Sequence, residues 1–135
     1  MSATQFATQI DAVVGRYIAI WNEPDPARRR GLIADTWSED ATYVDPMQSG
    51  QGRDGIDAMV AAVQEKFPGF RFALSGRPDG FREHARFGWS LFAPGGEAGG
   101  SPVAAGIDFA TFDADGRLRT VVGFVEPLPA QQSVA

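Results

Sequence analysis

The chain has 135 residues, a length that suits one domain, and 44% of them are hydrophobic, as in an ordinary globular core. It has no cysteine and one histidine, which excludes disulfide bonds, thiolate metal sites and multi-histidine metal sites. The net charge of −5 argues against a nucleic-acid partner. We find no transmembrane run and no signal peptide, so we expect a cytoplasmic protein without a membrane segment.

Helical signals dominate the first half of the chain. Apolar residues from Phe6 to Trp21 recur at spacings of three and four, which is typical of an amphipathic helix. Asp25 and Pro26 have the pattern of an N-cap and a first helical residue, and Asp54 is predicted to cap a third helix. The basic run that follows Pro26 is interpreted as a solvated helix face. The predicted helices cover about residues 4 to 22, 26 to 37 and 54 to 67.

Strand signals dominate the second half. A short strand, Ala41–Asp45, precedes the third helix, and Arg77–Gly80 has the composition of a turn. Helices on one side of an antiparallel sheet make an α+β fold. We expect the sheet to be strongly curved, so that three helices and the sheet form a cone with an internal pocket. The four further strands are predicted at about residues 70 to 76, 81 to 93, 103 to 112 and 118 to 126.

The strand Gly106–Phe112 carries a carboxylate at its centre. Side chains alternate between faces, so Asp108 shares one face with Ala110 and Phe112. Aspartate is disfavoured inside a strand, and a buried unpaired carboxylate tends to take up a proton. Asp108 is therefore a candidate functional residue.

Two further polar residues fall at informative positions. Tyr17 lies on the apolar face of the first helix, so its hydroxyl group needs a partner in the interior. A core tyrosine bonded to a backbone carbonyl would satisfy the same pattern. Asp45 ends the first strand directly before Pro46, where it is either a turn-forming residue or a functional one.

Four segments resemble the nuclear transport factor 2-like superfamily, and within it the SnoaL-like polyketide cyclase and ketosteroid isomerase branch. The resemblance covers nearly the whole chain and implies a single SnoaL-like domain over residues 1 to 135 with a cystatin-like fold. The superfamily also contains non-catalytic binding proteins, so fold alone does not assign function. The segments are Val13–Asn22, Asp40–Pro46, Gly106–Phe109 and Asp115–Arg117.

The resemblance also implies roles for three residues. Tyr17 matches the tyrosine that stabilises the enolate oxygen, and Asp45 matches the general base. Asp108 matches the protonated aspartic acid of the isomerases or the acid/base aspartate of the cyclases. Such a site would isomerise, cyclise or dehydrate a small apolar carbonyl compound, without metal or cofactor.

Bulky residues are expected around the pocket. Trp21 and Trp37 would narrow it, and Phe112 shares the face of Asp108. When the chain is aligned to the isomerase, the side chains of His84 and Arg86 are predicted to face the pocket. An error of one residue in that alignment would place them on the opposite face of the strand. Which face lines the pocket is left open.

Other functions fit the same residues. The chain could be a non-catalytic binding domain for a small ligand. Epoxide hydrolysis by Asp45, Arg86 and Asp108 is a weaker alternative. The branch with that activity carries arginine and aspartate two residues apart on one strand, and we identify no such strand in this sequence. We also expect a homodimer packed through the outer face of the sheet, where Ile107 and Phe109 are apolar.

Overall fold

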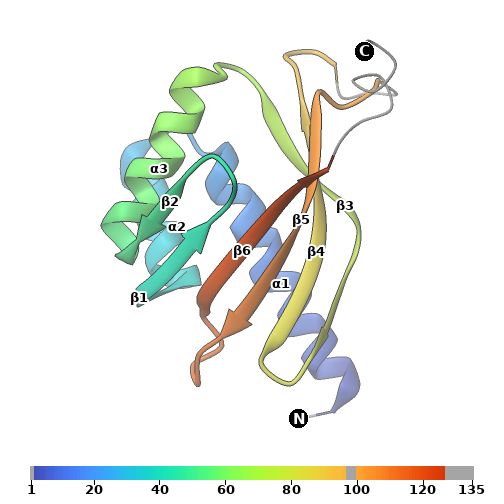
Figure 1. Ribbon diagram of the computed structural model, residues 1–135. Helices are drawn as coiled ribbons and strands as arrows, with labels where there is room; N and C mark the ends of the chain where they lie inside the picture. The colour runs from blue at the N-terminus through green and yellow to red at the C-terminus, as the bar shows by residue number, and fades with distance from the viewer. Residues whose placement is uncertain (1, 97–99, 127–135) are drawn as a thin grey trace.

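A computed structural model of the chain describes residues 2–96 and 100–126. Both ends of the predicted domain, residue 1 and residues 127–135, lie outside the described part. Three helices lie on one side of a six-stranded sheet, so the predicted α+β class is confirmed (Figure 1). The elements are α1 (Ala3–Asn22), α2 (Pro26–Thr36), β1 (Trp37–Val44), β2 (Ser49–Gln51), α3 (Gly52–Lys66), β3 (Arg71–Phe81), β4 (His84–Phe92), β5 (Ala104–Phe112) and β6 (Leu118–Glu126).

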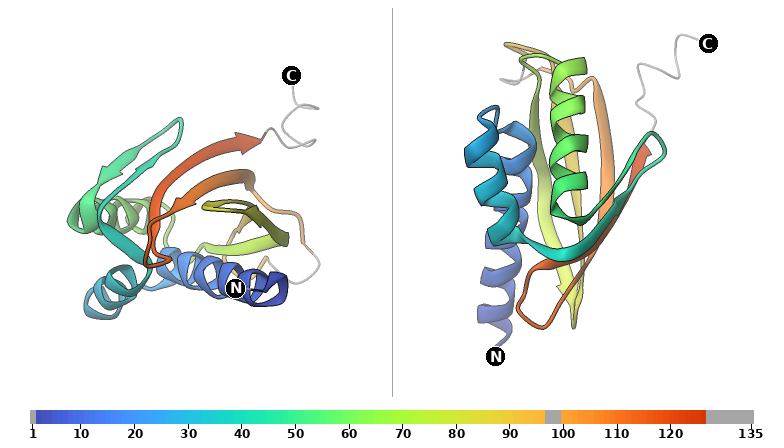
Figure 2. Two further views of the ribbon diagram at one scale, coloured as in Figure 1. Left: turned by 90° about the horizontal axis from the view of Figure 1, so that it is seen from below. Right: turned by 90° about the vertical axis from the view of Figure 1, so that its left-hand side faces the viewer.

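The sheet is mixed and has the strand order β2-β1-β6-β5-β4-β3. Strands β3 to β6 are antiparallel neighbours, as predicted, but β1 runs parallel to β6. A parallel pair needs a long crossover connection, and here the chain between β1 and β6 contains α3 and the four strands β2 to β5. The sheet bends over α1 and remains open (Figure 2). The short β2 was not predicted, because its three residues lie in a segment interpreted as a loop.

Local sequence signals account for the helix starts. Ser2 and Gln5 form a capping box at α1, and the Asp25 carboxylate accepts a hydrogen bond from the amide of Arg28 at α2. The predicted cap of α3 is wrong, since that helix begins at Gly52. Asp54 instead lies in its first turn, where a carboxylate interacts favourably with the helix dipole.

The turn predicted at Arg77–Gly80 is wrong. Strand β3 continues through it to Phe81, and the register against β4 shifts between Ser75 and Asp79. These residues therefore form an irregularity within the strand. The reversal of the chain comes at Arg82, whose φ of 50° is unusual for a residue other than glycine.

The core fills the space between the sheet and the helices. Arg29, interpreted from sequence as solvated, is only 4% exposed. Its Nε lies 2.6 Å from Oδ1 of Asp57, and it also donates to the backbone oxygen of Glu23 and to Gln64. This buried pair joins α2 to α3. Among the described residues, no helix is long and apolar enough to cross a membrane.

Candidate functional site

Asp108 lies at the centre of β5 with its side chain turned toward the helices, and it is only 2% exposed. The hydroxyl group of Tyr17, in α1, donates a hydrogen bond of 2.6 Å to Oδ2 of Asp108. The indole N–H of Trp89, in β4, donates one of 3.1 Å to Oδ1. Each oxygen of the buried carboxylate is thus held by an aromatic side chain from a different element.

A glycine allows Trp89 to reach this carboxylate. Trp89 and Gly106 are register partners in the β4–β5 pair. A Cβ atom on Gly106 would stand 2.5 Å from Cζ2 of Trp89, closer than carbon atoms can approach. The missing side chain leaves room for the indole ring over β5, two positions before Asp108.

Asp45 follows β1 and forms a second polar centre. The hydroxyl group of Tyr43 donates to its Oδ2 at 2.5 Å, and the Gln48 side-chain amide donates to the same oxygen at 3.2 Å. The backbone amides of Met47 and Gln48 donate to Oδ1 at 2.8 and 3.0 Å. Asp45 therefore closes a turn, as its position before Pro46 indicated, and also contacts the interior.

Gly123, in β6, brings the two centres together. A Cβ atom there would stand 2.8 Å from Oδ1 of Asp108 and 3.3 Å from the hydroxyl oxygen of Tyr43. It would also lie 3.3 Å from Cβ of Asp45. Both aspartates thus lie on the same side of the sheet, next to a space that glycine leaves open.

The surroundings of Asp108 change its ionisation. Burial raises its pKa to about 6, hydrogen bonds from Tyr17 and Trp89 oppose the rise, and the charge of Asp45 adds to it. The carboxyl group is then roughly nine-tenths ionised at pH 7. Burial, followed by the nearby Asp108 charge, raises the pKa values of Tyr17 and Tyr43. Both phenols therefore remain hydrogen-bond donors at neutral pH.

The structure brings together five of the residues named from the sequence. Tyr17, Asp45 and Asp108 belong to one cluster. Trp21 and Trp37 pack against Tyr17, with ring centroids 6.4 and 5.9 Å away. These two indole rings enclose the tyrosine in the core.

His84 and Arg86 do not face the interior. Both are exposed on the outer side of β4, where His84 lies beside Glu83 and Arg86 beside Asp79. The orientation taken from the isomerase alignment is wrong, because the register of β4 turns the intervening residue and Trp89 inward.

Sequence analysis missed two members of the site. Tyr43 and Trp89 were not named as site residues, yet they donate hydrogen bonds to Asp45 and Asp108, respectively. Tyr43 could have been found, since it lies two positions before Asp45 on the same strand. Trp89 could not have been found, because its contact with Asp108 depends on which face of β4 lines the interior, and the sequence left that question open.

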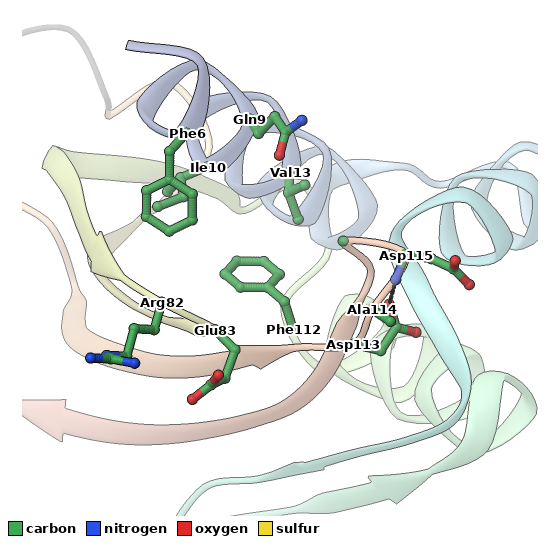
Figure 3. Close-up of a pocket in the computed structure, with 11 residues that line it drawn as sticks. Phe6, Gln9, Ile10, Val13, Arg82, Glu83, Phe112, Asp113, Ala114 and Asp115 are labelled. Atoms are coloured by element: carbon green, nitrogen blue, oxygen red, sulfur yellow. Dashed lines mark hydrogen bonds between the residues drawn. The ribbon is translucent and has the colours of Figure 1, made fainter. Parts of the chain in front are cut away.

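Three cavities lie elsewhere. One of about 450 Å³ lies beside the first half of α1, where the rings of Phe6 and Phe112 face its interior and Arg82 lies at its rim (Figure 3). Others of about 540 and 330 Å³ lie between the C-terminal ends of α1 and α3 and beside β3 and β4. None of these three is lined by Asp45 or Asp108, so the expected pocket shared by the two carboxylates is not among them.

Aromatic side chains occupy the space around the two carboxylates instead. Trp21 lies between Tyr43 and Phe72, at centroid distances of 5.7 and 5.4 Å, and Phe72 in turn contacts Trp89. In the described part of the chain, no three His, Cys, Asp or Glu residues are grouped to hold a metal ion. The chemistry available at the site is therefore that of carboxylates, phenols and indole rings.

Comparisons with known proteins identify the family and the fold. Residues 14–121 match the family model described as the SnoaL-like domain. A structure from Agrobacterium tumefaciens, described as a candidate isomerase of the SnoaL-like family, is 43% identical, with a TM-score of 0.82 over 89% of this chain and 99% of the other. No curated protein gives a significant match.

Two more distant structures share the fold. An NTF2-like protein of unknown function from Exiguobacterium is 22% identical, with a TM-score of 0.66 over 86% of this chain and 99% of the other. A candidate polyketide cyclase from Sinorhizobium meliloti is 17% identical, with a TM-score of 0.64 over 85% of this chain and 97% of the other.

Proposed function

Because the chain belongs to the SnoaL-like domain family, we propose that it is a cofactor-independent acid/base enzyme for a small apolar carbonyl compound. The reaction would be an isomerisation, a cyclisation or a dehydration. The observation that carries the proposal is Asp108, a buried carboxylate with a pKa of about 6, held by Tyr17 and Trp89. A general base works best when its pKa lies near the working pH.

The hydrogen bonds favour Asp108 over Asp45 as the base. Four donors stabilise the charge of Asp45, and two of them are backbone amides of its own turn. Asp108 accepts only two hydrogen bonds among the described contacts. Since a carboxylate has about four acceptor positions, Asp108 retains capacity to take a proton. This assignment differs from the isomerase roles that the resemblance implies, in which Asp45 is the base, and is consistent with the acid/base aspartate of the cyclases.

The proposed step moves one proton. The carbon–hydrogen bond next to the substrate carbonyl breaks, the proton passes to Asp108, and the electron pair moves toward the carbonyl oxygen as an enolate forms. Once Asp108 is neutral, the hydroxyl group of Tyr17 is released to donate to the enolate oxygen, with Tyr43 beside it. Return of the proton to another carbon completes an isomerisation.

Geometry does not favour epoxide hydrolysis. That reaction requires an arginine between two aspartates, but Nε of Arg86 lies 3.5 Å from Asp79 on the outer face. The non-catalytic binding domain remains the competing proposal. It uses the same aspartates as hydrogen-bond partners, and the experiment below separates it from the enzyme.

Proton exchange tests the proposal without knowledge of the natural product. A panel of apolar ketones and enones would be incubated with the protein in D₂O, and loss of the α-proton signal followed by NMR. We expect at least one compound to exchange, and Asp108→Asn to slow that exchange by about 100-fold or more. Asp79→Asn, an exposed control, should exchange at the native rate.

Two outcomes would count against the enzyme. Exchange at the native rate in Asp108→Asn would remove this residue as the base. Binding of a panel compound to the native protein with no exchange in any of them would favour the binding domain.

A further inference from the structure

Asp108 is buried too deeply to exchange a proton with water directly. Its side chain is 2% exposed, and it lines none of the three cavities described above. Among the described residues, its side-chain hydrogen bonds come from Tyr17 and Trp89. Exchange of a substrate α-proton for deuterium nevertheless requires this carboxyl group to trade its proton with solvent. The path of that proton therefore leads through other side chains.

Tyr17 provides the first step of such a path. The indole N–H of Trp89 can only donate, whereas a phenol hydroxyl group both donates and accepts. The hydroxyl group of Tyr17 lies 2.6 Å from Oδ2 of Asp108. Burial raises the pKa of Tyr43, and a hydrogen bond from Tyr17 opposes the rise. The single hydroxyl proton of Tyr17 thus has two acceptors, the carboxylate of Asp108 and the hydroxyl oxygen of Tyr43.

The space at Gly123 shows independently that Tyr43 and Asp108 approach each other. A Cβ atom at Gly123 would stand 2.8 Å from Oδ1 of Asp108 and 3.3 Å from the hydroxyl oxygen of Tyr43. Gly123 is the register partner of Asp108, and Tyr43 is paired with Val121 of the same strand, β6. Because Gly123 has no side chain, β6 places nothing between the two polar groups.

Asp45 lies at the other end of the path, closer to the surface. The hydroxyl group of Tyr43, which is only 5% exposed, donates to Oδ2 of Asp45 at 2.5 Å. Asp45 is partly exposed, and its turn leads to the exposed Met47. Of the two carboxyl groups, Asp45 is therefore the one in contact with solvent. We call Asp108, Tyr17, Tyr43 and Asp45 the tyrosine chain.

We propose that the tyrosine chain is a proton relay that carries the proton of Asp108 to Asp45 and from there to water. The protonated carboxyl group of Asp108 gives its proton to the hydroxyl oxygen of Tyr17, whose own proton passes to the hydroxyl oxygen of Tyr43. The proton of Tyr43 passes to Oδ2 of Asp45. Three O–H bonds break and three form, so both phenols are neutral before and after the transfer.

Asp45 is a carrier in this relay and not a second base. Four donors stabilise its charge, so its neutral form is short-lived and releases the proton to water. Tyr43 and Asp45 are positioning residues, which set how fast Asp108 loses its proton and not the pKa at which it does so. The relay rests on the proposed acid/base function, since it returns the same base to its ionised form.

The chain has only two tyrosines, Tyr17 and Tyr43, so their hydroxyl protons can be observed separately. The protein is labelled with ¹³C at the Cζ atom of tyrosine and dissolved in an equal mixture of H₂O and D₂O. A slowly exchanging hydroxyl group gives one Cζ line for O–H and one for O–D, and NMR exchange spectroscopy measures the rate between them. Tyr43→Phe assigns the signals, because it leaves Tyr17 as the only tyrosine.

We expect the hydroxyl proton of Tyr17 to exchange about tenfold or more slowly in Tyr43→Phe than in the native protein, because the path to Asp45 is cut. Asp45→Asn, whose amide cannot take up the proton, should slow the exchange by a similar factor and provides the test if Tyr43→Phe does not fold. Thr111→Val is the control. It removes a hydroxyl group that bonds to Thr120 outside the tyrosine chain, so Tyr17 should exchange at the native rate.

A purely structural role for Tyr43 predicts a change in the opposite direction. A buried hydroxyl group without a relay exchanges when the structure opens, so looser packing in Tyr43→Phe would accelerate the exchange of Tyr17. A single averaged line in the native protein that splits in the variants also supports the relay. Unchanged or faster exchange in either folded variant overturns it.

Failure of the relay can be told apart from failure of the proposed function. If Asp108→Asn slows α-proton exchange in the ketones but Tyr43→Phe does not slow exchange of the Tyr17 hydroxyl proton, the base stands and the relay is wrong. If Tyr43→Phe and Asp45→Asn both slow the hydroxyl proton but no ketone exchanges, the relay stands as a proton path and the proposed enzyme is wrong.

Discussion

The hydroxyl group of Tyr17 is 2.6 Å from Oδ2 of Asp108, although 91 positions separate the two residues in the sequence. The contact joins α1 to the middle of β5 across the core. It also lowers the pKa of Asp108 against the rise that burial causes. One hydrogen bond thus fixes a helix to the sheet and influences the pH at which the proposed base ionises.

Tyr17→Phe should therefore raise the pKa of Asp108 above its value of about 6. The carboxyl ¹³C signal of Asp108, followed by NMR from pH 4 to 9, measures this directly. Stability should also fall, by about 1–2 kcal/mol, because a buried acceptor loses a donor. Tyr43→Phe is the matched control, since its hydroxyl group bonds to Asp45 and not to Asp108. An unchanged Asp108 titration in Tyr17→Phe would contradict the role given to this contact.

Asp108 should also make stability depend on pH. Its folded pKa of about 6 lies above the unfolded value of about 3.9, so the folded state holds the proton more tightly. The resulting stabilisation is fully present below pH ~4 and is lost as pH rises through ~6. It amounts to roughly 3 kcal/mol. Burial of Asp108 is its main cause, the hydrogen bonds from Tyr17 and Trp89 reduce it, and the charge of Asp45 adds to it.

Urea unfolding at pH 4.5 and pH 8 measures this effect in the native protein and in Asp108→Asn. The variant cannot titrate at this position, so the difference in its free energy of unfolding between the two pH values should be smaller by about 1–3 kcal/mol. Asp79→Asn, on the outer face, should retain the native difference. If the free energy of unfolding changed equally with pH in Asp108→Asn and in the native protein, the carboxyl group of Asp108 would not be the cause of the change between pH 4.5 and pH 8.

The sequence predicts the fold well where patterns are local. Helical periodicity located α1, and strand signals located β5 and β6. It failed where tertiary contacts decide, as in β3, where the strand continues through Pro78 and Gly80 because β4 pairs with both sides of the irregularity. The parallel pairing of β1 with β6 likewise joins residues far apart in the sequence, so no local sequence pattern could predict it.

The candidate site shows the same division. Asp108 was identified because a carboxylate inside an apolar strand is unusual, and Tyr17 because its hydroxyl group needs a partner in the core. That they would meet each other came only from the resemblance. Trp89 contacts Asp108 because of the register between β4 and β5. Alternation of side chains along β4 could not show which of its two faces points inward, and His84 and Arg86 were misplaced for the same reason.

Gly106 provides a test of how Trp89 is placed. In Gly106→Ala the new Cβ atom would stand 2.5 Å from the indole ring and closer still to the backbone oxygen of Phe124, so the strand must shift. We expect the free energy of unfolding to fall by about 1–3 kcal/mol. Gly15→Ala, on the exposed face of α1 with no atom within 4 Å, should instead gain about 1 kcal/mol. Chemical denaturation of both variants gives the comparison, and equal effects would contradict the close packing at Gly106.

The outer face of the sheet carries an apolar patch formed by Ile107, Phe109, Val122 and Phe124. Phe109 and Phe124 are 43% and 56% exposed and contact each other edge to face at 5.7 Å. The helices cover the opposite face, and an apolar patch of this kind is typical of an interface. We propose that two copies pack through it around a two-fold axis.

Light scattering at micromolar concentration should therefore give a mass near twice the 14.5 kDa of one chain. Phe124→Glu would bury a charge at the centre of the proposed interface, because the two-fold axis brings the same patch of both copies together, and it should yield monomers. Phe81→Glu is the matched control. Phe81 is 65% exposed but ends β3 beside the chain reversal at Arg82, away from the patch, so this variant should remain dimeric. A native mass of one chain would refute the proposed dimer, and dissociation by Phe81→Glu but not by Phe124→Glu would move the interface to the β3–β4 end of the sheet.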